Sequence, residues 1–525
     1  MNARVSQRKA GVVLSYTTMA AQSVIAIAYT PVMLRLLGKS EYGVYNLVYS
    51  VVSYLGVLSF GFDSAYIRFY SRLQAKKDVT GMARLNGMFL TLFTLISILA
   101  LSAGSVLVKN ADSLFSGGLT DGEIKIAAVL MKLMVFNIAV TFPTSVFDSI
   151  VMIHEQYIFQ KTVNLLRTVL NPFLALPLLL MGYRSISLVV VTTALNVAGL
   201  LINIWFCLSK LKTQFIFSRF HLALLREIWI FSAYLFLNMV TEQANWSVDK
   251  IILGKMKGSS DVAVYSIGSQ FNTIYLSFST AISSVFVPKV NRMVAEHGDI
   301  KSLTNLFTKV GRIQFFVLSF ILTGFAFFGG YFIKGWAGRE YAGTYLTAYH
   351  IALLLMVPVT IPLIQNLGIE IQIAKNMHKF RSIVYALIAA ANLTASILLC
   401  PSLGGVGCAA ATAASITLGS GFLMNWYYQS RVGLDIHFFW KQILKTFPAL
   451  ILPAAFGFCV TRFFPVDSAA RFLGFGLLYS VLFFFSVWKF GLNAYEKGLV
   501  LQPFQKFVKN PARPQKTFLP GKDKS

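Results

Sequence analysis

Polar and carboxylate side chains recur at helical spacing inside one apolar segment, residues 228–249. Steps of four, three and four positions place these side chains on one face of a helix. The set comprises Asn238, Glu242, Asn245 and Asp249. A carboxylate in hydrocarbon costs roughly 2.5 to 3.5 kcal/mol, so such a face lines a cavity or pairs within the protein. Glu242 or Asp249 could there bind H⁺ or Na⁺, and a structural pair between Asp249 and Lys250 is the alternative.

Cationic side chains inside or beside apolar segments could hold a phosphate or pyrophosphate group. They are Arg35, Lys132, Arg167 and Lys250. Arg167 shares a helix face with Asn164 and Asn171, so it either faces a cavity or extends its guanidinium to the membrane surface.

Two further pairs of residues are candidates for a moving gate. Asp63 and Arg68 end an apolar segment beside the basic stretch RFYSRLQAKKD, where they form a gate contact or anchor the helix end. Pro358 and Pro362 lie about one helical turn apart, and each removes a backbone donor. They favour a bend that is either a hinge or a packing kink.

The motifs of several other chemistries are missing. There is no Gly-x-x-x-x-Gly-Lys-Ser/Thr phosphate loop, so ATP hydrolysis has no site. His154, His350 and His378 show no ligand spacing, and the 4 cysteines lie in apolar runs without paired spacing. We therefore expect no metal, no cofactor and no disulfide framework.

Composition requires a membrane around this chain. Hydrophobic residues make up 56% of the 525 positions and charged residues 13%, which is too much apolar surface for a soluble core to hide. Apolar runs without strand alternation predict helices that cross the bilayer. We predict fourteen: 11–34, 43–62, 86–108, 126–152, 162–182, 185–208, 228–249, 262–287, 313–333, 343–369, 382–400, 406–428, 443–461 and 472–488.

The positive charge sets the predicted orientation. With both ends of the chain in the cytoplasm, most of the 46 Lys and Arg residues fall on the cytoplasmic side, as the positive-inside rule requires. The net charge of +26 then lies mostly at the cytoplasmic surface of the membrane, where it attracts anionic membrane lipids, and no nucleic-acid partner is expected. Residues 489–525 form a basic cytoplasmic tail, predicted to be disordered.

A repeat relates the two halves. Leu37-Gly38-Lys39 recurs as Leu253-Gly254-Lys255, and polar positions match in the apolar segments that follow. The duplication predicts an N-terminal lobe at 1–211, a C-terminal lobe at 212–430 and a helix pair at 431–488. Its register sets Gln22 opposite Asn238 and Tyr29 opposite Asn245, which predicts a water-filled cavity between the lobes.

The opening of the chain resembles a known family. The stretches RLLGKSEYGVY and SFGFDSAYIRFY are similar to the N-terminus of bacterial polysaccharide-biosynthesis flippases, within the superfamily of multidrug, oligosaccharidyl-lipid and polysaccharide exporters. The resemblance covers about the first 80 residues. It implies two six-helix lobes around a central cavity, an added C-terminal helix pair, and inward-to-outward alternation.

The same resemblance implies a function. The substrate would be an oligosaccharide on undecaprenyl pyrophosphate, moved from the inner to the outer leaflet of the bacterial cytoplasmic membrane for surface polysaccharide biosynthesis. Polysaccharide-assembly proteins would be partners, and H⁺ or Na⁺ the coupling ion. A cation-coupled multidrug antiporter of the same fold is the first alternative. A membrane polysaccharide polymerase or ligase is the second, although such an enzyme would need a sizeable outer loop, and the outer loops here are short.

Overall fold

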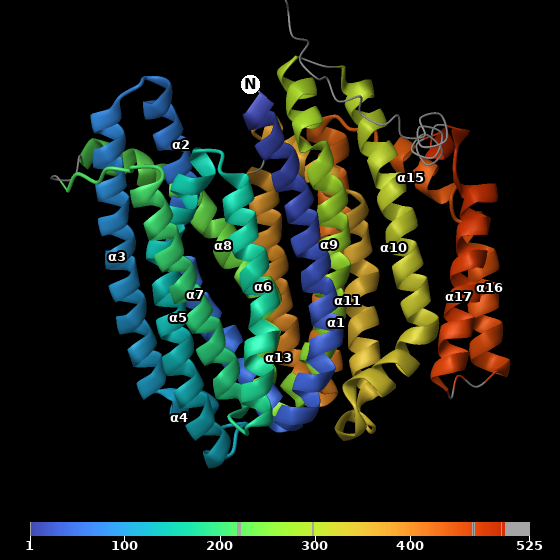
Figure 1. Cartoon of the computed structure of the whole chain (residues 1–525). Coiled ribbons are helices and arrows are strands. Elements are labelled where there is room, and N and C mark those ends of the chain that lie inside the picture. Colours follow the sequence, from blue (N-terminus) through green and yellow to red (C-terminus); the bar gives the residue numbers. More distant parts are fainter. Residues whose placement is uncertain are drawn as a thin grey trace, which may run out of the picture. The chain divides into compact units, whose positions relative to one another are not determined.

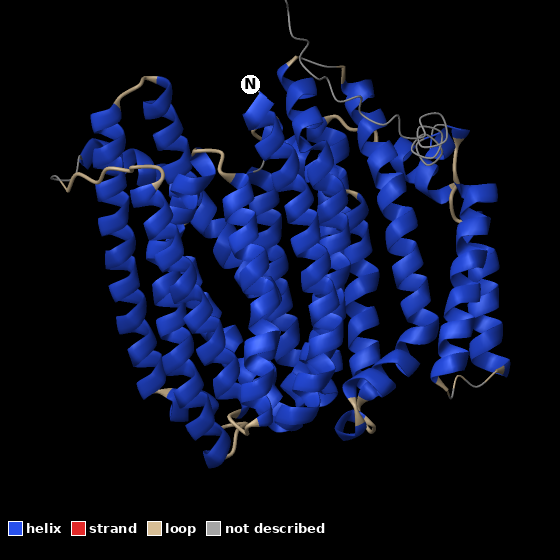
Figure 2. Cartoon of the chain, viewed as in Figure 1, coloured by secondary structure: helices blue, strands red, loops and turns tan. Residues whose placement is uncertain are grey.

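The computed structural model describes residues 2–217, 222–296, 299–377, 379–464, 466, 468–494 and 496–498. Every regular element in this part of the chain is a helix, and it contains no strand (Figure 2). The apolar runs therefore fold as helices, because helices satisfy their own backbone groups in lipid. The predicted all-α membrane fold is confirmed.

The elements of the first half are these: α1 (Asn2–Val52), the 3-10 segment η1 (Ser53–Ser59), α2 (Phe62–Ala75), α3 (Val79–Lys109), α4 (Ala111–Phe115), α5 (Asp121–Ile153), α6 (Tyr157–Leu180) and α7 (Arg184–Ser209). Figure 1 shows the long helices of this half packed side by side along one common direction.

The elements of the second half are these: α8 (Leu222–Met256), α9 (Ser259–Ala295), α10 (Ile300–Ala337), η2 (Arg339–Tyr341), α11 (Tyr345–Ile364), α12 (Asn366–Ala374), α13 (Lys379–Ile416), the π-helical η3 (Thr417–Leu423), α14 (Met424–Tyr427), the π-helical η4 (Tyr428–Val432), α15 (Ile436–Leu444), α16 (Pro448–Phe463), α17 (Ala469–Ser486) and the π-helical η5 (Val487–Gly491).

Two of the longest helices are broken at a glycine. Gly38 has φ 76° in α1, and Gly404 has φ 56° in α13, a region of the backbone map that glycine enters without steric cost. After Gly404 the chain turns back on itself, since Thr412 Oγ1 donates to Asn392 Oδ1 at 3.0 Å. Each of these helices therefore consists of two segments.

Ten helices among the described residues are long and apolar enough to cross a membrane, or eleven if the bent pair Ile436–Leu444 and Pro448–Phe463 is one span. The two glycine-broken stretches each count once in these totals. The chain is thus a multi-pass membrane protein. The number fourteen and the cytoplasmic position of both ends stay predictions.

The chain divides into two compact units, Met1–Ile436 and His437–Ser525. The first unit contains both predicted lobes, whose separation stays a prediction. The second contains most of the predicted helix pair, and residues 499–525 of the predicted tail lie outside the described residues.

Helix α1 runs antiparallel to α9 in the first unit. Tyr16 Oη donates to Ala281 O at 3.2 Å, while further along α1 the amide of Gln270 donates to Thr30 Oγ1 at 2.9 Å. Figure 1 shows the two helices side by side. Gly38 follows the first α1 segment. We call this end of the bundle the Gly38 end and the opposite one the N-terminal end.

Candidate substrate cavity and gates

A polar cavity of about 440 Å³ lies among three helices of the first repeat. Helix α1 contributes Ser15, Thr18, Met19 and Gln22, helix α6 contributes Lys161, Asn164, Arg167 and Thr168, and helix α7 contributes Asn196. Hydroxyls, amides and two cations therefore face one space inside an apolar bundle. Such a lining can bind hydroxyl groups together with an anion.

Arg167 is held in place at the wall of this cavity. Its Nη2 donates to Asn164 Oδ1 at 2.7 Å. Gly199 of α7 lies against the guanidinium, so that an added Cβ there would stand 2.9 Å from Arg167 Cζ. Asp148, which accepts from Asn203 Nδ2 at 2.8 Å, interacts with Arg167 electrostatically. The cation is thus positioned before any ligand arrives.

The cavity brings together Gln22 and Arg167, two of the residues singled out by the sequence. It does not include Asn238, the expected partner of Gln22. Asn238 accepts instead from Ser382 Oγ of α13 at 2.7 Å. Lys161 was not singled out, because it stands just before an apolar segment, where a lysine usually serves as an interface anchor.

Asp249 lies in a cage of neutral donors. Its side chain is only 3% exposed. The donors are Tyr265 Oη at 2.6 Å, Thr412 Oγ1 at 2.7 Å, Ser396 Oγ at 2.9 Å and Asn392 Nδ2 at 3.4 Å. The described residues show no ion pair between Asp249 and Lys250. A carboxylate caged by neutral groups is suited to taking up a proton or a cation.

The remaining residues of the predicted polar faces neither donate to Asp249 nor line the polar cavity. Glu242 is exposed on α8, whereas Asn245 Oδ1 and Tyr29 Oη are buried and have no hydrogen-bond partner among the described residues. Lys132 is exposed and Lys250 partly exposed. The structure therefore does not bring these side chains into the polar cavity.

At the N-terminal end, α2 contacts α8 through charged side chains. The guanidinium of Arg68 lies 4.7 Å from the ring centre of Phe231, and Arg72 pairs with Glu227 at 3.5 Å. Asp63 has one buried oxygen without a hydrogen bond in the described part of the chain. Arg68 thus touches the opposite repeat, as a gate residue would.

The prolines of α11 precede a break in the helix. Pro358 and Pro362 lie within α11, which ends at Ile364, and α12 begins at Asn366. The break at Gln365 comes shortly after Pro362, so this is a place where the helix axis can change direction.

Carboxylates join the two repeats at the Gly38 end. Glu123 accepts hydrogen bonds from the hydroxyls of Ser40 and Ser259, which belong to different repeats. Glu340 Oε2 accepts from the backbone N–H of Lys39 at 2.9 Å. Glu123 also completes a capping box with Thr120 at the start of α5.

The backbones of the two repeats also contact each other at the Gly38 end. A Cβ added at Gly43 would stand 1.9 Å from Ser259 O, and one added at Gly118 would stand 2.0 Å from Gly254 O. No side chain separates the repeats at either contact. The Gly38 end is therefore shut in this structure.

Comparisons with known proteins bear on this architecture. The model of a family described as polysaccharide biosynthesis protein matches residues 32–345. No curated protein matches the chain.

Among solved structures, the lipid II flippase MurJ in an inward closed conformation is similar, with a TM-score of 0.69, 15% identity, and coverage of 96% of this chain and 100% of that one. A MATE transporter in complex with MaL6 has a TM-score of 0.58 and 15% identity, covering 83% of this chain and 97% of that one. A MOP superfamily transporter from Pyrococcus furiosus has a TM-score of 0.58 and 16% identity, with coverage of 82% and 97%.

These likenesses establish the fold, and the match over residues 32–345 spans more than half of the chain. The protein belongs to the polysaccharide biosynthesis protein family and has the fold of MOP superfamily transporters.

Proposed function

We propose that the protein is a flippase that moves an oligosaccharide linked to undecaprenyl pyrophosphate from the inner to the outer leaflet of the bacterial cytoplasmic membrane. The polar cavity carries this proposal. Its amides and hydroxyls suit sugar hydroxyls, and Lys161 and Arg167 suit the pyrophosphate. The polyprenyl tail can stay in lipid while the head group crosses.

The close contact of the repeats at the Gly38 end supports alternating access. Backbone contacts at Gly43 and Gly118 shut the Gly38 end. With the N-terminus in the cytoplasm, the shut end faces outward and the cavity is loaded from the cytoplasmic side. Transport then requires the repeats to separate at the Gly38 end and to close at the other.

Asp249 is the candidate coupling site for H⁺ or Na⁺. Binding of either ion neutralises a carboxylate enclosed by the hydroxyls of Tyr265, Ser396 and Thr412. Because these donors come from α9 and both segments of α13, ion binding can change how the helices of the second repeat pack. Glu242, exposed on α8, is the second candidate.

A cation-coupled antiporter for small molecules is the alternative, because MATE transporters share the fold. Cell phenotypes distinguish the two. Deletion of the gene in its host is expected to abolish surface polysaccharide and to leave drug resistance unchanged, and a plasmid copy should restore the polysaccharide. Increased drug sensitivity with normal polysaccharide would favour the antiporter.

A further inference from the structure

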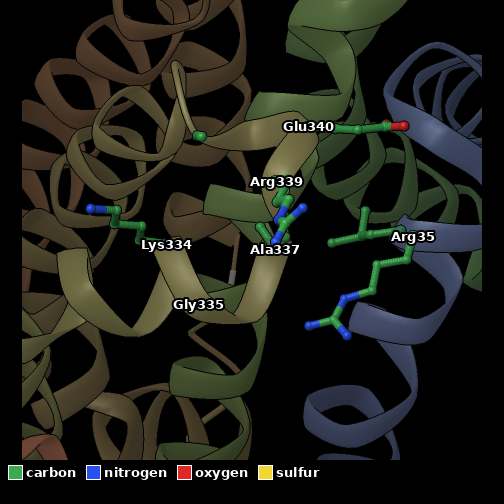
Figure 3. A pocket seen from close by; sticks show the side chains of 9 residues that line it. Arg35, Lys334, Gly335, Ala337, Arg339 and Glu340 are labelled. Carbon is green, nitrogen blue, oxygen red and sulfur yellow. The ribbon is translucent and has the colours of Figure 1, made fainter. Parts of the chain in front are cut away.

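A second pocket, of about 590 Å³, lies at the Gly38 end and is separate from the polar cavity. Its walls come from the end of the first α1 segment and from the corner between α10 and η2 (Figure 3). Three of the residues that line it are cationic: Arg35, Lys334 and Arg339. The only carboxylate in the lining is that of Glu340.

The two guanidiniums are available to a ligand. Within the described residues, neither the guanidinium of Arg35 nor that of Arg339 takes part in a hydrogen bond or an ion pair. Glu340 forms no ion pair with either guanidinium in this part of the chain, and its Oε2 accepts the Lys39 N–H at 2.9 Å. Figure 3 shows Glu340 directed away from the Arg35 guanidinium, while Arg35 extends from α1 towards the α10–η2 corner that carries Arg339.

The walls of the pocket are fixed by bonds on either side of it. Trp336 Nε1 donates to Ile27 O at 2.7 Å, which ties α10 to α1. The corner itself turns at Gly338, whose φ of 90° disfavours any side chain. The arginines are thus mounted on two elements that are held together without a ligand.

The pocket also lies at the predicted boundary of the membrane. Arg35 directly follows the apolar segment 11–34, and Lys334 directly follows 313–333, so both mark a membrane boundary. Leu34, Ala337 and Ala342 add apolar wall beside the charges. A charged fork next to an apolar wall fits an oxyanion attached to a hydrocarbon tail better than an ion free in water.

We propose that this pocket binds the phosphate or pyrophosphate oxyanion of a membrane lipid, with Arg35 and Arg339 as its two ligating side chains. Each guanidinium can donate two parallel hydrogen bonds to such a group. This inference rests on the membrane fold and not on the proposed flippase activity, so either can fail alone.

Native mass spectrometry of the purified full-length protein in detergent tests the proposal. The probes are undecaprenyl phosphate, phosphatidylglycerol and inorganic pyrophosphate, each titrated separately. We expect the Arg35→Gln/Arg339→Gln variant to bind both lipids about tenfold more weakly. The matched control Lys109→Gln/Lys125→Gln, which removes the same charge from exposed positions of α3 and α5, should bind as the parent protein does.

A second variant tests the same pocket without removing either arginine, in case the double substitution prevents folding. Ala342→Glu leaves both arginines in place and adds a carboxylate to the pocket, so it should weaken lipid binding as well. Equal binding by the parent protein and both pocket variants would overturn the proposal. Displacement of bound lipid by an equal concentration of inorganic pyrophosphate would overturn the assignment to a lipid.

Discussion

Gly43 of the first repeat and Ser259 of the second approach so closely that a Cβ at Gly43 would stand 1.9 Å from the Ser259 carbonyl oxygen. Close backbone contact of this kind is possible only where a side chain is absent. The relationship makes the Gly38 end a tight seal between the repeats.

Gly43→Ala is expected to hold this end partly open. The added methyl cannot fit 1.9 Å from a carbonyl oxygen, so the repeats must separate. A cysteine placed at Val44, whose side chain is 0% exposed, should then react with a water-soluble thiol reagent about tenfold faster. Gly122→Ala is the matched control, since nothing lies within 4 Å of its added Cβ. Equal reactivity in the two variants would show that the contact does not seal the end.

Glu123→Ala should weaken the same seal without adding bulk. It removes the acceptor shared by the hydroxyls of Ser40 and Ser259, and each hydrogen bond to a charged group contributes about 1.5 to 3 kcal/mol at most. We expect a lower thermal unfolding midpoint and faster labelling of the Val44 cysteine. Asp121→Ala, in the same first turn of α5, should change neither measurement.

Arg167→Lys is expected to reduce transport about tenfold although the charge is kept. The planar guanidinium of Arg167 can donate to Asn164 and to a ligand at the same time, whereas the ammonium group of a lysine lacks this geometry. Gly199→Ala should also reduce transport. Its Cβ would stand only 2.9 Å from Arg167 Cζ, so the guanidinium would have to move. Transport rates in proteoliposomes, measured beside the amount of folded protein, check both variants. A Gly199→Ala variant with parental transport would show that the position of Arg167 does not matter.

Asp249→Asn should uncouple transport from the ion gradient. Asparagine cannot change charge, and its amide group would meet hydroxyls that now donate to Asp249. The expected result is a transport rate that no longer responds to imposed H⁺ or Na⁺ gradients. Thr412→Val removes one donor only and should leave part of the response. A full response in Asp249→Asn would exclude this carboxylate as the coupling site.

Much of the helical fold follows from the sequence because the length of an apolar run is a local property. The position of Asp249 in an apolar segment also indicates that its carboxylate has polar partners within the protein. Its donors could not be predicted, because Asn392 and Thr412 meet only after the chain reverses at Gly404.

The placement of Gln22 opposite Asn238 across a water-filled cavity stays a prediction. A repeat shows which positions are equivalent and not which ones touch. Gln22 faces α6 and α7 of its own repeat, and Asn238 contacts Ser382. Close approach at Gly43 likewise left no pattern that distinguishes it from any other glycine in a helix.

Passage of a lipid-linked oligosaccharide across the membrane can be measured directly. The purified chain is reconstituted in liposomes with a fluorescent oligosaccharide on undecaprenyl pyrophosphate in one leaflet, and an enzyme that cleaves the sugar is added outside. We predict that the enzyme will cleave a larger fraction of the oligosaccharide in liposomes that contain the protein than in protein-free liposomes. The Arg167→Lys variant should slow the rise of this fraction about tenfold. An identical cleaved fraction with and without the protein, under H⁺ and Na⁺ gradients of either direction, would contradict the account.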